Sequence, residues 1–559
     1  MTEDLREGIR KLVKQAKAAA ELVRSYPDNI RIFGQYDADG ITATSIFIKS
    51  LLREGKTFHS TILKQLTAAN LELVKSSKEK FIVLLDFGSG QLEFLNQLKE
   101  KTIIIIDHHQ PQGTPENHIT QVNPIEFGIA ENISSSGTSY LVSCAMDKNN
   151  TDLAELAIIG AIGDSQMGSI GSEWGLLGLN REIVKDAVDS KKIKQLKSLR
   201  IWGRLSRPIH KALEYCIDPY IPNISGSESG AVHLLQELGI PIQKEDGSWR
   251  TLSDLSVEEQ KKLASGIIIE RASGNQENPD WIFGDVYELV DRDPDFSDAA
   301  EFATLINATG KLGKPYLGTA LCLGDPESYK KVRDLADEYR KKIGSYLRWV
   351  EKNKDKVIKE TDKAVYVFAE DKISEHVISN VISIMHKGKY SKKPLLGLVC
   401  SEEGLKISAR ASDELVEAGV NLKEILSSVT KQLGGDGGGH KAAAGGTIQL
   451  GKEVEFIKMV DLKLKEAELI HEESLASAST DKHINTQSKL VESVQKVETD
   501  SVGFHPFYEQ TRHKETGTEG EGKAGKTPVE DNGRGKGEVN QSRKLEKMER
   551  KGLVRYLVS

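Results

Sequence analysis

The sequence is poor in cysteine and in aromatic residues, has no excess of positive charge, and contains no apolar run long enough to span a membrane. Its four cysteines, at 144, 216, 322 and 400, lie far apart without metal-site spacing, which predicts buried thiols in a reducing compartment. A net charge of −7 gives no general attraction to nucleic acid, so that any such binding requires local basic patches. The N-terminus also lacks the apolar core of a signal peptide. We therefore expect a cytoplasmic protein without a membrane partner.

The 559 residues are enough for several domains, and strands alternate with helical segments in two separate regions. We predict an α/β fold, with a doubly wound parallel-sheet catalytic domain over residues 1–190 and a smaller α/β substrate-binding domain over 361–468, across a cleft. Residues 191–360 are expected to form a basic connector, an inserted subdomain and a helical linker. Residues 469–559 are polar and poor in aliphatic side chains, which predicts a disordered tail.

Apolar segments followed by acidic residues recur along the first domain. Four isoleucines at 103–106 lead into Asp107-His108-His109, and we interpret such runs as strands buried on both faces. Because open α/β sheets bind ligands at the carboxyl ends of their strands, these side chains should converge on a divalent-metal site. For any single aspartate the alternative is a helix N-cap or a turn residue. The other segments are 30–33 before Asp37 and Asp39, 81–85 before Asp86, and 157–163 before Asp164.

These residues also resemble a known family. The segment 36–43 (Tyr-Asp-Ala-Asp-Gly-Ile-Thr-Ala), Asp86, Asp107-His108-His109 and Gly163-Asp164 resemble the four motifs of the DHH phosphoesterases. The segment 437–445 (Gly-Gly-Gly-His-Lys-Ala-Ala-Ala-Gly) resembles the signature of the C-terminal domain that accompanies them. Segments 301–308 and 323–325 resemble the archaeal RecJ-like branch, which includes the GINS-associated nuclease. The resemblance covers about residues 20–465.

The resemblance implies a two-metal site. Asp37 would bind the first ion, Asp39 the second, and Asp86 would bridge them, while His108 and Asp164 would complete the second position. Carboxylates combined with imidazole suit manganese, with magnesium as the other possibility. Two ions roughly 4 Å apart can activate a water and stabilise the leaving oxygen of a phosphodiester.

Two further residues receive catalytic roles from the resemblance, and one position departs from the family pattern. His109 would contact the scissile phosphate, and Asp107 would orient the imidazoles. Gln35 stands where the family usually has His or Asp. Because a neutral amide is a poorer ligand, the first ion is expected to bind weakly or only together with substrate, which leaves cleavage slower or in doubt.

Two other segments are candidates for binding the substrate. Glycines at 434–435 and 437–439 allow close approach of a phosphate or base, and together with Arg410 they favour a nucleotide-binding cradle over a flexible turn. The residues that we assign to it are Arg410, Gly438, Gly439, His440 and Lys441. Serines and a threonine at 134–139 either cap a helix or bind a phosphate at its start.

Residues 191–213 carry eight basic side chains, one tryptophan and no acid. This mixture suits single-stranded nucleic acid, and Trp202, Arg204 and Arg207 are the contacts that we assign. The alternative is a solvated connecting helix.

Three functions follow from these patterns. The first is a two-metal exonuclease that acts on single-stranded DNA or RNA in replication or repair. The second is a phosphodiesterase for oligonucleotides or cyclic dinucleotides, which would share the catalytic site. The third is a non-catalytic scaffold of a replication helicase that binds GINS.

Overall fold

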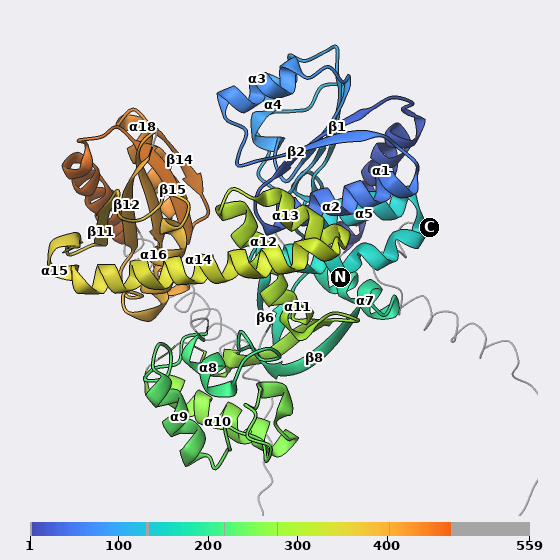
Figure 1. The fold of residues 1–559 in the computed structure, drawn as a ribbon. Helices are drawn as coiled ribbons and strands as arrows, with labels where there is room; N and C mark the ends of the chain where they lie inside the picture. The colour runs from blue at the N-terminus through green and yellow to red at the C-terminus, as the bar shows by residue number, and fades with distance from the viewer. Residues whose placement is uncertain are drawn as a thin grey trace, which may run out of the picture.

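A computed structural model describes residues 3–129, 133–170, 173–216, 219–274, 276, 278–401 and 403–470. Figure 1 shows an N-terminal α/β domain in blue, a green helical subdomain and an orange C-terminal α/β domain, with one long helix running between the two α/β domains. The segment predicted as a disordered tail lies outside the described residues from 471 onward. Among the described residues, no helix combines the length and the apolar content needed to cross a membrane.

The N-terminal sheet consists of five parallel strands in the order β2-β1-β3-β4-β5. One face packs on α1 (Glu3–Ser25), α2 (Ala38–Arg53), α5 (Ser135–Met146) and α6 (Ala154–Gly163), and the other on α3 (Ala68–Ser76) and α4 (Leu92–Leu95). Helices on both faces bury the apolar runs of the central strands, so the predicted doubly wound fold is confirmed. The strands are β1 (Ile30–Gln35), β2 (Phe58–Leu63), β3 (Phe81–Leu85), β4 (Thr102–Ile106) and β5 (Ile119–Val122).

The prediction of a strand at 157–163 is wrong, because these residues belong to α6. This helix contacts α2, α5 and α12 (Ala299–Lys311) and is buried over most of its surface. A helix that is apolar all round has no amphipathic period, and its sequence therefore reads like a buried strand. Asp164 is the C-cap of α6 and reaches the sheet edge from a helix.

The basic segment at 191–213 is not a connecting helix. It begins with β8 (Ile193–Leu199), which pairs antiparallel with β9 (Phe283–Leu289), and it ends in α8 (Ile209–Glu214). Helices α8, α9 (Glu228–Glu237) and α10 (Val257–Ser273) then form the inserted subdomain around an apolar core of their own.

Three helices link the two α/β domains. They are α12, α13 (Pro315–Leu323) and the 27-residue α14 (Pro326–Lys352), which is about 40 Å long at 1.5 Å per residue. Val332 and Leu335 of α14 lie in the N-terminal core, whereas Tyr339 and Val350 lie in the C-terminal core. Ala308 of α12 also packs in the C-terminal core, so both helices are shared between the domains.

The C-terminal sheet has six strands in the order β10-β11-β12-β13-β15-β14, with one parallel pair, β11 and β12. Helix α16 (Ile378–Gly388) covers one face; α18 (Leu422–Gln432) and helical residues 453–470 cover the other. The glycine-rich segment predicted as a loop forms the edge strand β14, which is joined to β15 by a turn at 440–442. The strands are β10 (Ile358–Glu360), β11 (Val365–Glu370), β12 (Leu395–Ser401), β13 (Gly404–Arg410), β14 (Asp436–Gly439) and β15 (Ala443–Ile448).

Some smaller elements complete the described fold, and one cysteine departs from expectation. Cys144, Cys216 and Cys322 are buried as predicted, but Cys400 is exposed near the end of β12, beside the turn into β13. The remaining elements are β6 (Met167–Ile170), β7 (Glu173–Leu176), α7 (Asn180–Asp189), α11 (Pro294–Ser297), α15 (Lys354–Val357) and α17 (Asp413–Glu417).

Candidate metal centre

The carboxyl ends of β1, β3 and β4 come together at one edge of the N-terminal sheet. Gly34 pairs with Leu85, and Leu85 pairs with Ile106, so that the residues following each strand meet there. In the strand order, β2 lies on one side of β1, and β3, β4 and β5 lie on the other. The carboxyl ends of β1 and β3 therefore form the switch point of the sheet, where open α/β sheets bind ligands. Asp86 adopts a left-handed backbone with φ 67°, and its N–H donates to the carbonyl of Ile106 at 2.9 Å. A non-glycine residue in this conformation is typical of functional sites.

Helix α5 holds Asp39 through its first backbone amides. The N–H of Ser135 donates to Asp39 Oδ2 at 2.8 Å, and that of Ser136 donates to Oδ1 at 2.9 Å. Asp39 is only 2% exposed, and the positive end of the helix stabilises its charge. The hydroxyl of Ser134 accepts from Gly137 N at 3.2 Å, so the capping interpretation is confirmed and a carboxylate of the chain occupies the amides considered for phosphate.

Asp37 is the N-cap of α2, and its Oδ1 accepts from Gly40 N at 3.0 Å. A Cβ on Gly40 would lie 2.5 Å from Cβ of Gln35, so glycine is required for this close approach. From α12, Asn307 Oδ1 accepts from Ala38 N at 2.8 Å. The loop that carries Asp37 is therefore fixed from both sides.

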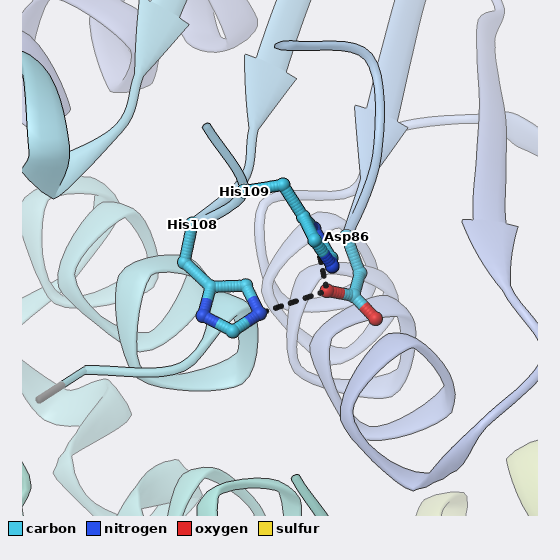
Figure 2. A group of neighbouring side chains, drawn as sticks. All are labelled: Asp86, His108 and His109. Carbon is cyan, nitrogen blue, oxygen red and sulfur yellow. Dashed lines mark ion pairs between the residues drawn. The ribbon is translucent and has the colours of Figure 1, made fainter. Parts of the chain in front are cut away.

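The imidazole of His108 points into the group of carboxylates. Its Nε2 lies 3.5 Å from Asp164 Oδ2, 3.6 Å from Asp86 Oδ1 and 3.9 Å from Asp39 Oδ2. Figure 2 shows His108 and His109 both directed at the carboxylate of Asp86. Two sets of three residues have ligand atoms within 4.8 Å of one another: Asp39, His108 and Asp164, and Asp86, His108 and His109.

Two buried polar atoms at the centre of this group have no hydrogen-bond partner among the described residues: Asp86 Oδ1 and His108 Nε2. An unsatisfied buried polar atom costs about 1–3 kcal/mol, and more if it is charged. A divalent cation satisfies a carboxylate oxygen and an imidazole nitrogen at the same time, and oxygen with imidazole ligands suits manganese or magnesium. The residues present therefore fit a divalent ion.

The pKa shifts of these side chains also indicate a site for a cation. Burial, together with the neighbouring carboxylates, raises the pKa of Asp86 and of Asp164 well above the usual range. Burial also lowers the pKa of His108, although the charge of Asp39 opposes the change. Packed carboxylates of this kind cannot all ionise without a cation to compensate them.

Asp107 fixes the imidazole of His109. Its Oδ1 lies 2.8 Å from His109 Nδ1 and accepts from the backbone N–H groups of His108 at 2.8 Å and His109 at 3.1 Å. Its Oδ2 accepts from Ser89 N at 3.0 Å. Burial alone would lower the pKa of His109, but the charge and hydrogen bond of Asp107 outweigh it and raise that pKa to about 9. Asp107 therefore favours the protonated imidazole of His109. The predicted contact of Asp107 with the ring of His108 is absent among the described hydrogen bonds.

The sequence did not point to Gln166. Its Nε2 donates to Asp164 Oδ2 at 2.8 Å and lies 3.4 Å from His108 Nδ1. Its Oε1 accepts from Asn180 Nδ2 at 2.6 Å. Gln166 thus orients one carboxylate and one imidazole of the group. A lone glutamine between a helix and a strand carries no spacing signal that could have identified it.

Lys311 lies between the metal centre and the C-terminal domain. This last residue of α12 donates to Asn380 Oδ1 of α16. Burial and the charge of Arg410 lower the pKa of Lys311 to about 8, while the charge of Asp37 opposes the change. The pKa of Lys311 therefore depends on the charge of Arg410, the predicted substrate-binding arginine, and on that of Asp37 in the first metal motif. The sequence suggested only a basic, glycine-containing loop here.

Further basic side chains from both domains gather in the same region. Lys64, which follows β2, pairs with Glu375 at 3.7 Å across the two domains. Burial and the charge of Lys64 lower the pKa of Lys406 to about 8. Arg410 donates through Nε to Ser383 Oγ at 2.7 Å, and burial lowers its pKa to about 10. This junction between the domains is therefore rich in basic side chains, and through Lys311 it lies near Asp37 of the candidate metal centre.

The other predicted substrate-binding residues lie on β14 and the turn after it. Gly438 has open space where a Cβ would project, whereas Gly439 has φ 133° and its Cβ would lie 2.6 Å from the carbonyl of Ala443. His440 and Lys441 are exposed in the turn. Their role in binding a substrate stays a prediction, as does the cleft between the domains.

Of the tentative nucleic-acid contacts, Arg204 has to be corrected. It is 4% exposed, with Nε 2.7 Å from Asp298 Oδ2 and Nη1 2.8 Å from Glu288 Oε1, and it is therefore an internal ion pair. Arg207 lies over the ring of Trp202 at 4.3 Å and is partly exposed. Arg207 and Trp202 stay candidates for contact with a strand.

Comparisons with known proteins agree with this geometry. The model of the DHH family N-terminal domain matches residues 29–161, that of the DHH-CID domain matches 201–279, and that of the DHHA1 domain matches 361–466. The uncharacterized protein MJ0831 of Methanocaldococcus jannaschii is 31% identical over 466 residues, which are 81% of this chain and 98% of that protein.

Two solved structures share the fold. RecJ from Thermus thermophilus in complex with Mn²⁺ is 19% identical, with a TM-score of 0.51 over 82% of this chain, which spans 55% of the RecJ chain. CDC45 from Entamoeba histolytica is 12% identical, with a TM-score of 0.52 over 82% of this chain and 98% of that one. At such low identities the likeness shows a common fold. With the DHH N-terminal, DHH-CID and DHHA1 domain models matched in this order along the chain, the protein belongs to the DHH family, and it shares its fold with RecJ.

Proposed function

We propose that this protein is a divalent-metal-dependent exonuclease that hydrolyses single-stranded DNA or RNA during DNA replication or repair. One observation carries the proposal: Asp86 Oδ1 and His108 Nε2 are buried, face each other at 3.6 Å and have no hydrogen-bond partner among the described residues. A pair of this kind is suited to a cation and ill suited to a merely structural role. The cytosol, expected from the scattered cysteines, stays the proposed location.

The metals that we propose are two manganese ions, with magnesium as the other candidate. Asp39, Asp86, His108 and Asp164 would hold one ion, and Asp37 with Asp86 the other. Such ions activate a water at neutral pH and offset the charge that develops on the leaving oxygen.

The protein's own side chains would position the phosphodiester. Asp107 holds His109 at 2.8 Å and favours its protonated form, so that its other ring nitrogen can donate to a phosphate oxygen. Lys311 and Arg410 supply positive charge between the domains for phosphates further along the strand. Such remote binding would hold the scissile bond in place for attack.

The test is hydrolysis of end-labelled single-stranded DNA and RNA in the presence of manganese. Asp86→Ala should lower the rate by more than the roughly 10–100-fold that is typical of losing an outer partner of a metal ligand. Asp152→Ala, which removes a carboxylate from the surface pair with Arg53 at 2.7 Å, is the matched control and should keep the wild-type rate. Undiminished hydrolysis by Asp86→Ala, or in the presence of chelator, would contradict the proposal.

The same time course separates two alternatives. A phosphodiesterase for oligonucleotides or cyclic dinucleotides would cleave dinucleotides and leave long strands intact. A non-catalytic scaffold that binds GINS is favoured by the fold shared with CDC45 and by Gln35 in place of a metal ligand. A protein of this last kind would cleave none of the substrates at any manganese concentration and would co-purify with GINS.

A further inference from the structure

Gln35 reaches into the space between two of the carboxylates proposed for the first ion. It is the last residue of β1, and its side-chain amide lies beside Asp37 and Asp86. In the metal-free protein the amide is satisfied only with its nitrogen toward the carboxylates, because an oxygen in this place would face acceptors alone. With the nitrogen there, Gln35 donates to Asp37 Oδ2 at 2.5 Å, Asp37 Oδ1 at 3.1 Å and Asp86 Oδ2 at 2.8 Å.

An ion and this amide cannot occupy the same place. Asp37 and Asp86 would hold an ion through the same oxygens that accept from the amide, and magnesium–oxygen bonds are only about 2.0–2.1 Å long, so the ion and the amide nitrogen compete for these oxygens. The amide satisfies the two carboxylates as a hydrogen-bond donor but leaves their charge uncompensated. Gly40 lies close to the base of the same side chain, since a Cβ there would be 2.5 Å from Gln35 Cβ. The amide itself is held by its hydrogen bonds to Asp37 and Asp86.

The second position differs in this respect. Asp39, His108 and Asp164 present ligand atoms within 4.8 Å of one another, and Asp86 Oδ1 is aimed at the same place. Among the described residues no donor fills it, since His108 Nε2 and Asp86 Oδ1 lack hydrogen-bond partners. The neighbouring amide of Gln166 donates to Asp164 Oδ2 and lies 3.4 Å from His108 Nδ1, and it leaves His108 Nε2 and Asp86 Oδ1 without a partner. One ion position is thus open, and the other is closed by a side chain.

We infer that the Gln35 amide takes the place of the first metal ion, so that the free protein binds a single divalent cation through Asp39, Asp86, His108 and Asp164. An additional ion binds at the first position, between Asp37 and Asp86, only when the Gln35 amide is displaced. The inference rests on the metal centre of the proposed function but not on its substrate. The metal requirement of the resting protein therefore differs from that of the protein engaged with a strand.

Calorimetric titration of the full-length protein with Mn²⁺, without nucleic acid, tests the inference by counting ions per chain. Wild type should bind one ion. Gln35→Asp and Gln35→His, which restore a ligand, should bind two, and the second should bind at least about tenfold more tightly than any second ion of wild type. Gln236→His, the same substitution at an exposed glutamine of α9 in the inserted subdomain, is the matched control and should leave the number at one. Thermal melting confirms that each variant is folded, and the use of two ligand types guards against failure of one.

Two ions bound to wild type with similar affinity would overturn the inference, as would a single ion bound to both folded Gln35 variants. Either result leaves hydrolysis of single strands open. Conversely, a protein that binds one ion in wild type and two in the variants, yet cleaves nothing, contradicts the proposed exonuclease and upholds the role of Gln35.

Discussion

At the scale of single residues, the charge of Lys311 is a feature that can be changed through the pH of the solution. Its pKa of about 8 lies below the ordinary value of 10.5, so the side chain loses its proton within a range where most lysines stay charged. We expect the affinity for a labelled single strand to fall as the pH rises through about 8. Lys311→Arg should keep the affinity up to higher pH. Fluorescence anisotropy in an Asp86→Ala background, which should not cleave, measures both.

A second measurement on Lys311 separates substrate binding from stability. Between pH 8 and 10.5 the folded protein binds fewer protons at this residue than the unfolded chain, so Lys311 makes the free energy of unfolding rise with pH. Lys311→Met should remove this rise in urea unfolding at pH 8 and pH 10. If wild type and Lys311→Met show the same change of the free energy of unfolding with pH and the same affinity for a labelled single strand, Lys311 has neither role.

Arg204 and Arg207 lie three positions apart but should respond in opposite ways. Arg204→Ala leaves Asp298 and Glu288 without their buried counterion and should cost about 3–5 kcal/mol of stability. Arg207→Ala removes a partly exposed cation over Trp202, worth about 0.5–1 kcal/mol, and should instead weaken strand binding. Its salt dependence should become shallower by about one unit of slope. Melting curves and salt titrations of both variants provide the check; unchanged strand binding by Arg207→Ala would remove this surface from the proposal.

At the scale of elements, the hairpin of β14 and β15 offers two adjacent glycines with different constraints. Gly439→Ala should destabilise the domain by more than about 1 kcal/mol, because φ 133° does not suit alanine and the Cβ would strike a carbonyl. Gly438→Ala meets open space and should leave the melting temperature unchanged. If β14 contacts the substrate, the added methyl group should weaken strand binding. Wild-type affinity in both Gly438→Ala and His440→Ala would exclude the hairpin from the substrate surface.

The elements also show how far the sequence could lead. Strands β1, β3 and β4 were predictable because parallel strands buried on both faces read as continuous apolar runs, and the acids after them met at one edge as expected. The failure at α6 has the same origin, since a helix enclosed by α2, α5, α7 and α12 is equally apolar. Gly160 allows this packing, because a Cβ there would lie 2.1 Å from Ser136 Oγ. Contacts such as those of Gln166 and Lys311 join distant segments, and no local pattern encodes them.

At the scale of the whole molecule, binding of an ion at the metal centre should raise the free energy of unfolding. A ligand that binds only the folded state stabilises it by about 2.7 kcal/mol at a hundred times its dissociation constant. We expect manganese to raise the melting temperature and chelator to reverse the shift. Asp164→Asn should abolish most of it, and since this side chain is 27% exposed, the substitution should not disturb the core. Identical melting of wild type in manganese and in chelator would show that the group of carboxylates holds no ion.

Helix α12 has a consequence that concerns regulation. Asn307 braces the loop of the first metal motif, Ala308 lies in the core of the C-terminal domain, and Lys311 binds α16. A nucleic-acid strand that shifts the C-terminal domain would therefore also shift the loop that carries Asp37, next to Gln35. Ion binding and strand binding then become coupled equilibria, and such coupling is reciprocal: the factor by which a strand tightens the ion is the factor by which the ion tightens the strand. Manganese and strand ends would act as effectors of each other, and the affinity for either, measured alone, would be an underestimate.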